Sequence, residues 1–545
     1  MFTTGLLVLT APLNQLSHRI APILHYAAGK VDKILYVHLQ PNYVSETESN
    51  FLRVTPTTDL CAAVTRLHTG AANLCSRLDI RILLGNVGKP TEPLVYPRTL
   101  QNKVEFILTD CVNQNNDNFK TFMEGNYVLK PFPKMEFLKE SDWKTSSNDN
   151  LSGMDWSLPK SEELQTYGHI VLGGTFDHVH AGHKILLSES IMRSERKITI
   201  GVTSGPMLES KSLCELIQPV ETRITDVRNY IQDVKPHILF DDSVVPITDP
   251  FGPSIVVPDM GGIVVSEETR KGGDAVNKRR KEKGLSQLDV HVIDIVDDTC
   301  HASHEETKIS SSSQRIRLLG TLLRAPQDHQ STSPYIIGLT GGIASGKTSV
   351  CKRLEKLGAA IINCDQLGHK AYEPGMKAYE QVVKEFGQDV VGADGLINRK
   401  ALGAKVFADK SRLEVLNQIV WPEIARMAKE QIQQLTSKGH NVCVLDAAVL
   451  LEAGWQDFVN EIWVCVIPKD EALRRITDRD SIPEEKARQR IESQISNQAR
   501  VDQANVVLST LWEPEVTQKQ VESAWELLQE RLSETSPPRP KQPKI

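Results

Sequence analysis

The sequence lacks several features that would place it in a specialised class of protein. Its 545 residues contain nine cysteines but no C-x-x-C pair, which argues against a disulfide framework and a zinc site. The formal net charge of -6 argues against a general nucleic-acid-binding protein. No stretch reaches the roughly 20 uninterrupted apolar residues of a membrane-spanning helix, and we find no internal repeat or heptad pattern. These absences leave a reduced, intracellular α/β protein as the expectation.

The N-terminal segment 1–31 is apolar and has no acidic residue. Arg19 and Lys30 are its only fixed cations, whereas a mitochondrial targeting peptide would be richer in arginine and serine. Pro12 and Pro22 would interrupt a long amphipathic helix. The segment is therefore expected to be a strand and a helix that open a folded domain. Targeting to an organelle or peripheral association with a membrane is the open alternative.

Two polar segments, 141–160 and 325–334, divide the chain into three blocks of similar size. Both are rich in residues that favour turns and bury little apolar surface. At about 150 residues per domain, a chain of this length is expected to hold about three to four domains. We predict domains at 1–150, 165–325 and 334–532, and a disordered tail at 533–545.

The two ends of the chain carry no catalytic motif. In the first block, short apolar runs at 34–39, 80–84 and 104–108 alternate with helical stretches, which predicts an α/β domain of unknown role. The tail has PxxP spacing from Pro537 to Pro540, which can bind an SH3-type partner in an extended form. A solvated tail without a partner is the simpler interpretation.

The third block opens with the signature of a phosphate-binding loop. The run 335–339 predicts a buried strand, and G-x-x-x-x-G-K-T separates it from a helix predicted over 349–357. Backbone N–H groups of such a loop surround phosphate oxygens, and the helix N-terminus adds positive partial charge. In this pattern Lys347 reaches the phosphates of ATP and the Thr348 hydroxyl binds Mg²⁺. The predicted ATP-binding residues are Gly341, Gly342, Ile343, Ala344, Ser345, Gly346, Lys347 and Thr348.

Two aspartates follow predicted strands of the same block. Asp365 comes just past the run 359–363, and Asp446 follows 442–445. This edge of an open α/β sheet faces the ligand crevice, so Asp365 is placed to accept a proton from an attacking hydroxyl. Capping of a helix is the alternative for Asp365, and Asp446 is a candidate for the Mg²⁺ shell. Candidates for a lid over the ATP phosphates are Arg474, Arg475, Arg479 and Arg490.

Residues from about 335 to 530 resemble dephospho-coenzyme A kinases. The resemblance rests on the segments IGLTGGIASGKT, CDQLGHKAYEPG, GLINRKALGAKVF, DAAVLLEAG and RRITDRD, and on a family glutamine at Gln494. It implies that Lys347 and Asp365 are catalytic, with Asp365 as the base for the ribose 3′-hydroxyl. It also implies that Arg399 lies in the acceptor site and that Arg479 belongs to the lid and contacts ATP.

The central block carries an H-x-G-H motif at residues 180–183. The motif follows a strand predicted at 170–172 and the turn GGTFD, and His183 opens an amphipathic helix. Histidines at the positive end of a helix are placed to meet the ATP triphosphate and to stabilise charge at its α-phosphate. A Ser-rich helix start at 309–315 is the expected second half, although a simple helix cap would explain it alone. The predicted ATP-binding residues are Gly173, Gly174, Thr175, His183, Ser310, Ser311, Ser312 and Arg315.

Residues 165–325 resemble phosphopantetheine adenylyltransferases of the eukaryotic and archaeal type, in the HxGH nucleotidyltransferase superfamily. Further matching segments are GVTSGPMLESK, DPFGP and VVSEETRKGGDAVNKRR. The resemblance implies that His180 and His183 are catalytic and contact ATP. It also implies that Thr175, Lys211 and Arg223 bind 4′-phosphopantetheine at its phosphate. That phosphate is already a nucleophile, so positioning and charge stabilisation can carry the reaction without a general base.

A few positions depart from the two family patterns. Trp421-Pro422 stands where the kinases usually have His-Pro, and Ala448 replaces a usual proline. In the central block Ser312 stands where threonine is usual, and the additional Arg317 leaves the arginine assignment ambiguous. The kinase departures bear on acceptor contacts more than on the ATP site.

The two resemblances name consecutive reactions, and the whole fusion resembles the bifunctional coenzyme A synthases of animals. The implied fold is a Rossmann-like HxGH nucleotidyltransferase domain followed by a P-loop kinase domain, after an N-terminal α/β domain. ATP and 4′-phosphopantetheine would give dephospho-coenzyme A and pyrophosphate, and a second ATP would give coenzyme A and ADP, with Mg²⁺ as cofactor. The expected location is the cytoplasm, with mitochondria or their outer surface as the alternative.

Two other functions stay open from the sequence. One is a different fusion of a nucleotidyltransferase with a P-loop kinase, which would act on another acceptor. The other is a scaffold whose enzyme domains are relics, and the intact motif residues Lys347, Thr348, Asp365, His180 and His183 argue against it.

Overall fold

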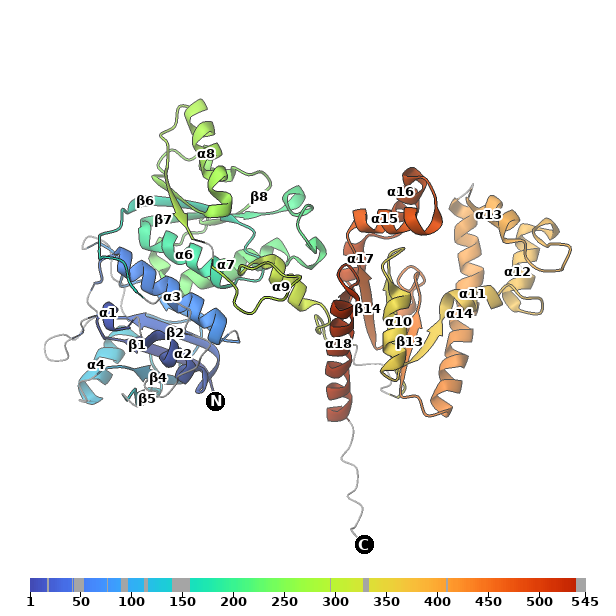
Figure 1. The fold of residues 1–545 in the computed structure, drawn as a ribbon, viewed down its shortest axis with the longest axis horizontal. Helices are drawn as coiled ribbons and strands as arrows, with labels where there is room; N and C mark the ends of the chain where they lie inside the picture. The colour runs from blue at the N-terminus through green and yellow to red at the C-terminus, as the bar shows by residue number, and fades with distance from the viewer. Residues whose placement is uncertain are drawn as a thin grey trace, which may run out of the picture. The chain divides into compact units, whose positions relative to one another are not determined.

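The computed structural model describes residues 1–16, 19–41, 43, 53–75, 77–89, 97–111, 116–139, 157–294, 296–326, 333–407 and 410–535. The chain divides into two compact units, 1–314 and 315–545. The described residues form three five-stranded sheets, all parallel, which Figure 1 shows in blue, green and yellow to red. The predicted polar segments and the PxxP tail lie mostly or wholly outside these residues. In the described part of the chain, no helix is long and apolar enough to cross a membrane.

The first sheet is built by the N-terminal block. Its strand order is β3-β2-β1-β4-β5, so β1 is the middle strand. Leu6–Leu9 of β1 are fully buried, and Leu7 and Leu9 share one core with Ile20 and Leu24 of α2. The apolar N-terminal segment therefore forms the strand and helix that were expected. The elements are β1 (Phe2–Leu9), α1 (Leu13–Leu16), α2 (Ile20–Ala28), β2 (Val31–Leu39), α3 (Thr58–Leu74), β3 (Asp79–Leu83), β4 (Phe106–Thr109), α4 (Asn116–Asn126) and β5 (Lys134–Phe137).

The second sheet has the order β10-β9-β6-β7-β8. Because β6 and β7 are parallel neighbours, their carboxyl ends meet at one edge, where β6 leads through the GGTFD turn into α6. The elements are β6 (Tyr167–Gly174), α6 (Ala181–Arg193), β7 (Ser194–Thr203), α7 (Val220–Val234), β8 (Val244–Ile247), β9 (Gly262–Ser266), α8 (Arg270–Glu282), β10 (Asp289–Ile293) and α9 (Ser311–Leu318).

The first two sheets belong to one compact unit. One hydrophobic core includes Leu7 and Val37 of the first sheet together with Leu172 of the second and Ile231 of α7. Helix α3 packs on α6, and α7 packs on β3. The apolar faces of these helices therefore cover two sheets at once, and the two blocks predicted as separate domains share a core.

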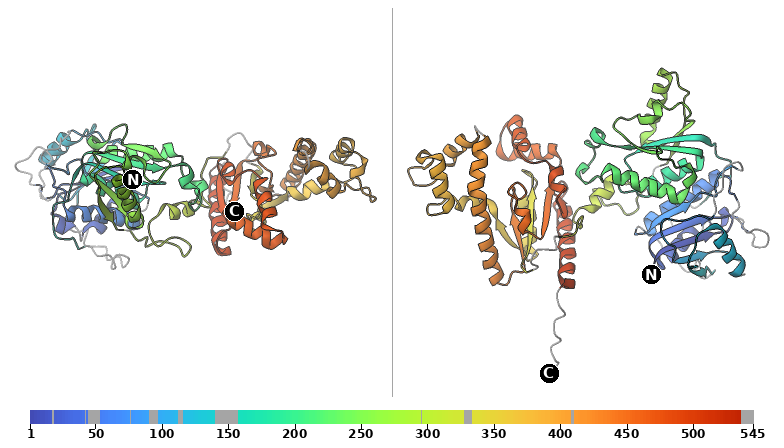
Figure 2. Two further views of the ribbon diagram at one scale, coloured as in Figure 1. Left: turned by 90° about the horizontal axis from the view of Figure 1, so that it is seen from above. Right: turned by 180° about the vertical axis from the view of Figure 1, so that it is seen from behind.

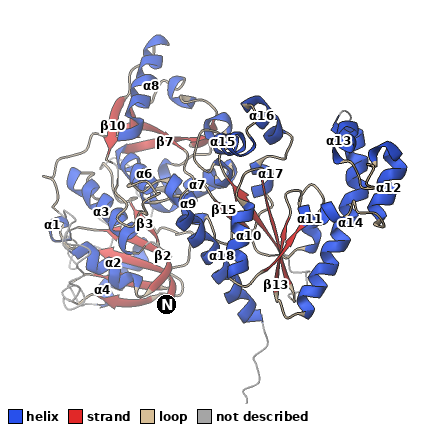
Figure 3. Ribbon diagram, turned by 45° about the vertical axis from the view of Figure 1, so that its right-hand side comes forward, coloured by secondary structure: helices blue, strands red, loops and turns tan. Residues whose placement is uncertain are grey.

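The third sheet, in unit 315–545, has the order β12-β13-β11-β14-β15, with helices around it (Figure 3). Its strands are continuous apolar runs, as expected for parallel strands covered on both faces. Figure 2 shows α14 and α18 as its longest helices, and α18 extends past residue 533, into the segment predicted as a tail. The strands are β11 (Tyr335–Gly341), β12 (Ala360–Asn363), β13 (Val442–Asp446), β14 (Glu461–Val466) and β15 (Val506–Ser509).

The helices of this unit carry Lys347, Thr348 and the arginines predicted for the lid. Helix α10 begins at Lys347, two residues earlier than predicted, so Lys347 and Thr348 lie in its first turn. The helices are α10 (Lys347–Lys356), α11 (Cys364–Lys370), α12 (Lys377–Phe386), α13 (Arg399–Phe407), α14 (Lys410–Ser437), α15 (Lys469–Asp480), α16 (Glu484–Glu492), α17 (Asn497–Val501) and α18 (Pro514–Thr535).

Candidate active sites

The phosphate loop connects β11 to α10 and curls tightly, as the motif predicts. Gly346 has a φ of 84°, a left-handed conformation that favours glycine. A Cβ at this position would come within 2.6 Å of the Thr510 side chain. Ala344 also has a positive φ, of 61°. The loop is thus held in a conformation that other residues at Gly346 would disturb.

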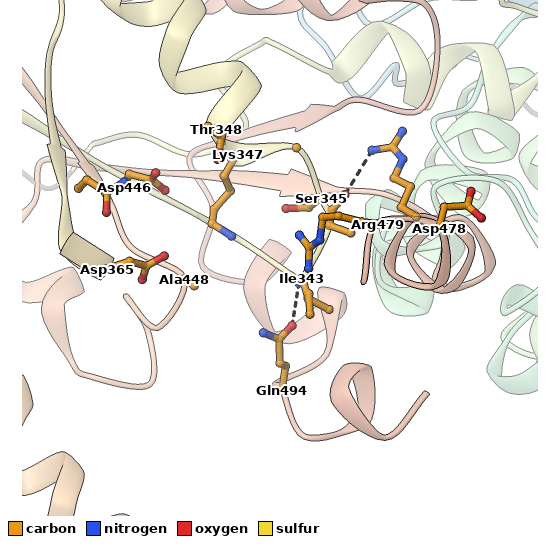
Figure 4. Close-up of a pocket in the computed structure, with 14 residues that line it drawn as sticks. Ile343, Ser345, Lys347, Thr348, Asp365, Asp446, Ala448, Asp478, Arg479 and Gln494 are labelled. Atoms are coloured by element: carbon orange, nitrogen blue, oxygen red, sulfur yellow. Dashed lines mark hydrogen bonds between the residues drawn. The ribbon is translucent and has the colours of Figure 1, made fainter. Parts of the chain in front are cut away.

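A cavity of about 740 Å³ opens beside this loop. In the view of Figure 4, Lys347 lies between Asp365 and Asp446 on one side and Arg479 on the other. The structure therefore brings the predicted phosphate loop, base and lid arginine to one cavity. Its lining residues are Ile343, Ala344, Ser345, Gly346, Lys347, Thr348, Asn363, Asp365, Asp446, Ala448, Arg475, Asp478, Arg479 and Gln494.

Asp365 and Asp446 reach the cavity from adjacent strands. Asn363, at the end of β12, pairs with Asp446 at the end of β13. Asn363 also caps α11, because its Oδ1 accepts from the Gln366 N–H at 2.9 Å. The alternative in which Asp365 caps this helix is therefore wrong, and its exposed carboxylate faces the cavity.

The charges at this end of the cavity influence one another. Burial raises the pKa of the Asp446 carboxyl; the nearby Lys347 opposes this shift, and the negative charge of Asp365 adds to it. The Lys347 ammonium also donates to the Gly341 carbonyl at 3.0 Å. Because a single lysine faces two carboxylates, a further cation would stabilise the ionised forms of both.

Arg475 and Thr510 hold the phosphate loop from the side of α15. The Arg475 guanidinium donates to the Ala344 carbonyl at 3.3 Å, to Thr510 Oγ1 at 2.8 Å and to the Thr510 carbonyl at 2.6 Å. Thr510 Oγ1 in turn donates to the Ser345 carbonyl at 3.0 Å. Thr510 follows β15 and belongs to none of the sequence motifs, so no pattern pointed to it. Arg475, predicted only as a lid candidate, contacts the loop.

Gln494 binds the same loop from another side. Its Oε1 accepts from the Ile343 N–H at 2.8 Å (Figure 4). The glutamine noted in the family pattern is thus a support of the phosphate loop. It engages one loop N–H that is then unavailable to phosphate.

Two more of the predicted arginines, Arg479 and Arg399, lie in different environments. Arg479 lines the cavity, and its guanidinium pairs with Asp480 at 2.7 Å. Arg399 begins α13, where it is exposed and lies over the Tyr372 ring at 5.9 Å. Among the described residues, the cavity lining includes Arg479 but not Arg399. A contact of Arg399 with the acceptor stays a prediction.

The two departures from the kinase pattern are also separated in the structure. Ala448 lines the cavity, and its carbonyl accepts from Thr340 Oγ1 at 3.2 Å. Trp421 and Pro422 lie within α14 and are not among the described lining residues. Only Ala448 therefore adjoins the ATP site.

The H-x-G-H motif lies at the start of α6, as predicted. The imidazole rings of His180 and His183 stack with centroids 3.9 Å apart. The His180 backbone N–H donates to Nδ1 of His183 at 3.5 Å. Because Nδ1 accepts, the single proton of a neutral His183 is assigned to Nε2.

The surroundings of His183 determine its charge. Burial lowers the pKa of His183 to about 3, and the positive charge of Lys211 lowers it too. The ring is therefore neutral near pH 7 and offers phosphate a hydrogen bond from Nε2 instead of a full positive charge. Lys211 therefore lies near enough to His183 for its charge to act on the ring, and its contact with the acceptor phosphate stays a prediction.

The Ser-rich segment contacts the first motif. Ser311 Oγ donates to the Asp177 carbonyl at 3.2 Å and lies 3.3 Å from Nε2 of His180. Because the hydroxyl proton is used by Asp177, Nε2 of His180 is the donor to Ser311. Ser310 caps helix α9, since its Oγ accepts from the Ser313 N–H at 3.1 Å. The segment thus caps α9 and also orients His180.

Three further residues of the second motif differ in exposure. Ser312 is half-buried, Arg315 is buried, and Arg317 is exposed. The two arginines that the sequence could not distinguish therefore lie in opposite environments. A contact of Ser312 or Arg315 with ATP stays a prediction.

Arg223 fixes the carboxyl ends of β6 and β7. It is only 1% exposed, and its Nη1 donates to the Thr175 carbonyl at 2.7 Å and to the Thr203 carbonyl at 2.8 Å. Its Nε donates to the Gln218 carbonyl at 2.8 Å. Thr203 also donates from Oγ1 to Oγ1 of Thr175 at 3.2 Å. The structure thus gives Arg223 a positioning role at Thr175, where the sequence predicted a contact with phosphate.

Three family models match successive parts of the chain. The model described as dephospho-CoA kinase matches residues 335–511, the cytidylyltransferase-like model matches 171–318, and the COASY N-terminal domain model matches 3–122. These ranges follow the three sheets. In the described part of the chain, no group of three or more His, Cys, Asp or Glu side chains could hold a metal ion.

Individual relatives cover the last third of the chain. The dephospho-CoA kinase of Geobacter sulfurreducens is 40% identical over 190 residues, which are 35% of this chain and 96% of that protein. That of Carboxydothermus hydrogenoformans is 40% identical over 186 residues, 34% of this chain and 90% of that protein. Among solved structures, the dephospho-CoA kinase from Campylobacter jejuni is 24% identical, covers 37% of this chain and 98% of its own, and has a TM-score of 0.29.

Proposed function

The chain belongs to the dephospho-CoA kinase family through its C-terminal unit, and we propose that it carries out the last two steps of coenzyme A synthesis. Its cytidylyltransferase-like domain supplies the first of these steps and its kinase domain the second. The COASY N-terminal domain precedes both. The observation that carries the proposal is the meeting of Lys347, Asp365 and Asp446 in one cavity beside the phosphate loop.

In the kinase step, the 3′-hydroxyl of dephospho-coenzyme A attacks the γ-phosphorus of ATP and ADP leaves. Asp365 accepts the hydroxyl proton, since its carboxylate is exposed to the cavity and is not used as a helix cap. Lys347 and the loop N–H groups bind the β- and γ-phosphates. Arg479 lines the opposite side and adds positive charge for the transferred group.

The donor set at this site fits Mg²⁺. The Thr348 hydroxyl and the Asp446 carboxylate are hard oxygen donors, and both line the cavity. The raised pKa of Asp446 indicates a carboxylate whose ionised form a cation would stabilise. When bound with ATP, Mg²⁺ supplies neutralisation of charge on the β- and γ-phosphates.

In the adenylyl-transfer step, a phosphate oxygen of 4′-phosphopantetheine attacks the α-phosphorus of ATP and pyrophosphate leaves. The neutral His183 donates a hydrogen bond from Nε2, while Ser311 holds His180 beside it. Thr175 and Lys211 bind the acceptor phosphate. The choice of acceptor is supported by the neighbouring kinase domain, because the product of this step is the substrate of the next.

The test supplies ATP, Mg²⁺ and 4′-phosphopantetheine to the purified full chain, and coenzyme A is the expected product. Parallel reactions with CTP in place of ATP address the other nucleotide that a cytidylyltransferase-like domain could use. The Lys347→Ala variant is expected to form dephospho-coenzyme A but no coenzyme A. The His183→Ala variant is expected to form no dephospho-coenzyme A. Formation of neither product by the wild-type chain, or of a cytidylyl product only, would contradict the proposal.

A further inference from the structure

The N-terminal domain meets the nucleotidyltransferase domain along the helix that carries the H-x-G-H motif. Within unit 1–314, helix α3 packs on α6 (Figure 1). Helix α6 begins with the motif itself, so its placement sets that of His183. Contacts on α6 from the N-terminal domain can therefore influence adenylyl transfer.

The residue that follows His183 is bound by strand β3. The Lys184 side chain is 11% exposed, and its Nζ donates to Asp79 Oδ1 at 2.5 Å and to the Ile80 carbonyl at 3.1 Å. Burial alone would raise the pKa of Asp79, but Lys184 and Arg81 together lower it. The ammonium of α6 is thus paired with a carboxylate of the N-terminal domain.

One turn further along α6, the same face is bound again. Ser188 Oγ lies 3.3 Å from Nε2 of the buried His68 in α3. The thiol of Cys61, also in α3, contacts the Glu189 carboxylate. Residues four apart on a helix share one face, so Lys184 and Ser188 present a continuous polar edge to the N-terminal domain.

We propose that the N-terminal domain positions the catalytic helix for adenylyl transfer, with Asp79 and Lys184 as the positioning pair. The proposal rests on the proposed first step. Because the Lys184 ammonium is fixed by β3, the backbone of its neighbour His183 is held relative to the ATP site. A catalytic group displaced by about 1 Å can lose on the order of 100-fold in rate, so loosening this pair is expected to lower kcat.

The test compares Asp79→Asn with Asp32→Asn, a matched change at an exposed position of β2. We expect the kcat of adenylyl transfer to fall at least about tenfold for Asp79→Asn, with a smaller change in KM. The kinase step, measured on added dephospho-coenzyme A, is expected to stay at the wild-type rate in both variants. A kcat for Asp79→Asn equal to that of Asp32→Asn would overturn the proposal.

A double-mutant cycle separates positioning from general loss of structure. Lys184→Met removes the ammonium and keeps an unbranched side chain. If the pair acts together, Asp79→Asn/Lys184→Met loses about as much kcat as either single variant. Fully additive losses would contradict a joint role. Absence of adenylyl transfer in the wild-type chain would instead remove the proposed first step itself.

A separate observation concerns the fold of the N-terminal domain. Its sheet order is β3-β2-β1-β4-β5, and that of the nucleotidyltransferase domain is β10-β9-β6-β7-β8. When strands are counted from the start of each domain, both orders read 3-2-1-4-5 from one edge. All pairings in both sheets are parallel. The fold therefore repeats although the sequence shows no internal repeat.

The registers of the two sheets also correspond. Thr10 and Thr175 are the first residues after β1 and β6. Five residues before them, Gly5 pairs with Phe106 in β4, and Ile170 pairs with Gly262 in β9. Four residues after these two partners come Asp110 and Ser266. Asp110 thus stands in the N-terminal domain where Ser266 stands in the nucleotidyltransferase domain.

The Asp110 carboxylate accepts hydrogen bonds from the donors that follow β1. The residue is 4% exposed, its Oδ1 accepts from the Thr10 N–H at 2.6 Å and from Thr10 Oγ1 at 2.9 Å, and its Oδ2 accepts from the Ala11 N–H at 3.2 Å. At the corresponding Thr175, the proposed function places the phosphate of the acceptor. Carboxylate and phosphate oxygens accept the same kind of hydrogen bond.

From this correspondence we infer that the N-terminal domain is a non-catalytic copy of the nucleotidyltransferase fold, in which Asp110 fills the phosphate position. Only the assignment of that position to phosphate rests on the proposed function. The negative charge of Asp110 repels a second anion, so the copy retains the architecture without the substrate.

Chemical rescue tests this inference without measuring activity. Asp110→Ala removes the carboxylate and exposes the N–H groups of Thr10 and Ala11 to small anions. At constant ionic strength set with NaCl, phosphate is expected to raise the Tm of Asp110→Ala by a few degrees more than that of the wild type. Ile107→Ala, a destabilising change in the buried part of β4, is the control and is expected to gain no more than the wild type.

Asp110→Asn is the second variant, because its amide keeps the position filled without the charge. It is expected to lose stability and to gain nothing specific from phosphate. Equal responses of Asp110→Ala, Ile107→Ala and the wild type would overturn the inference. So would an Asp110→Ala chain that stays unfolded at all phosphate concentrations.

Discussion

The imidazole ring of His180 stacks on that of His183 with 3.9 Å between centroids, and the His180 backbone N–H donates to Nδ1 of His183. This relationship assigns the proton of the neutral His183 to Nε2. The first residue of the H-x-G-H motif therefore determines which hydrogen-bond donor the last one presents. The spacing of the two histidines therefore matters in part because it brings the His180 N–H to Nδ1 of His183.

The protonation of His183 gives the first prediction. Because burial and Lys211 hold its pKa at about 3, its ring signals are expected not to titrate between pH 5 and 8 in histidine-labelled protein observed by NMR. Lys211→Met removes the neighbouring positive charge and should raise this pKa. A titration of His183 near 6.5 in the wild-type chain would contradict the burial argument.

The same shift has a consequence for stability. The pKa of His183 is lower in the folded chain than the usual 6.5, so the unfolded chain binds the proton first as the pH falls. Unit 1–314 should therefore lose stability between about pH 6.5 and 3. His183→Gln should lose less over this range when unfolding is followed against pH. An unchanged acid sensitivity of this variant would show that His183 is not the group responsible.

Ser311 gives the third prediction. Ser311→Ala removes the acceptor of the His180 Nε2–H and leaves that ring without this orientation. Loss of one such bond is expected to lower the kcat/KM of adenylyl transfer by about tenfold, while the kinase step is unchanged. Ser311→Thr keeps the hydroxyl and Ser286→Ala alters an exposed serine of the same domain, so both should stay near wild type. Equal rates for Ser311→Ala and Ser286→Ala would contradict the role.

Residues that act through local sequence could be predicted without the structure. The strand, glycine turn and helix around Lys347 are adjacent in the chain, and so are those around His183. Asp365 and Asp446 follow short apolar runs, and parallel strands bring such ends together at one edge. Local pattern and sheet geometry together therefore determined most of both sites.

Residues that act through distant partners could not be predicted in this way. Arg223 received a phosphate contact by resemblance, but its partners are carbonyls at the ends of two strands. Thr510 donates a hydrogen bond to the Ser345 carbonyl although the two residues are 165 positions apart in the chain, and no sequence motif relates them. The core shared by the first two sheets likewise depends on contacts between α3 and α6. Contacts between residues so distant in the chain produce no pattern that can be recognised in a single sequence.

Asp365 gives the fourth prediction. Asp365→Asn removes the proton acceptor while keeping the shape of the side chain, so the kcat of the kinase step should fall by about 10²- to 10⁴-fold. The KM for ATP should change little, because the phosphate loop is intact. Asp470→Asn, an exposed position in the first turn of α15, is the matched control. Wild-type kcat in Asp365→Asn would show that the attacking hydroxyl loses its proton elsewhere.

Thr510 gives the fifth prediction, because its hydroxyl connects Arg475 to the phosphate loop. Thr510→Val keeps the shape but removes the donor to the Ser345 carbonyl and the acceptor for Arg475. The loss of a part-buried hydrogen-bonded link costs about 1 kcal/mol or more, and we expect the kcat/KM for ATP in the kinase step to fall at least about fivefold. Thr510→Ser keeps the hydroxyl and should retain most of the activity. If Thr510→Val kept the wild-type rate and Thr510→Ser lost it, the methyl group beside Gly346 would be the relevant contact, and the hydroxyl would have no part in holding the loop.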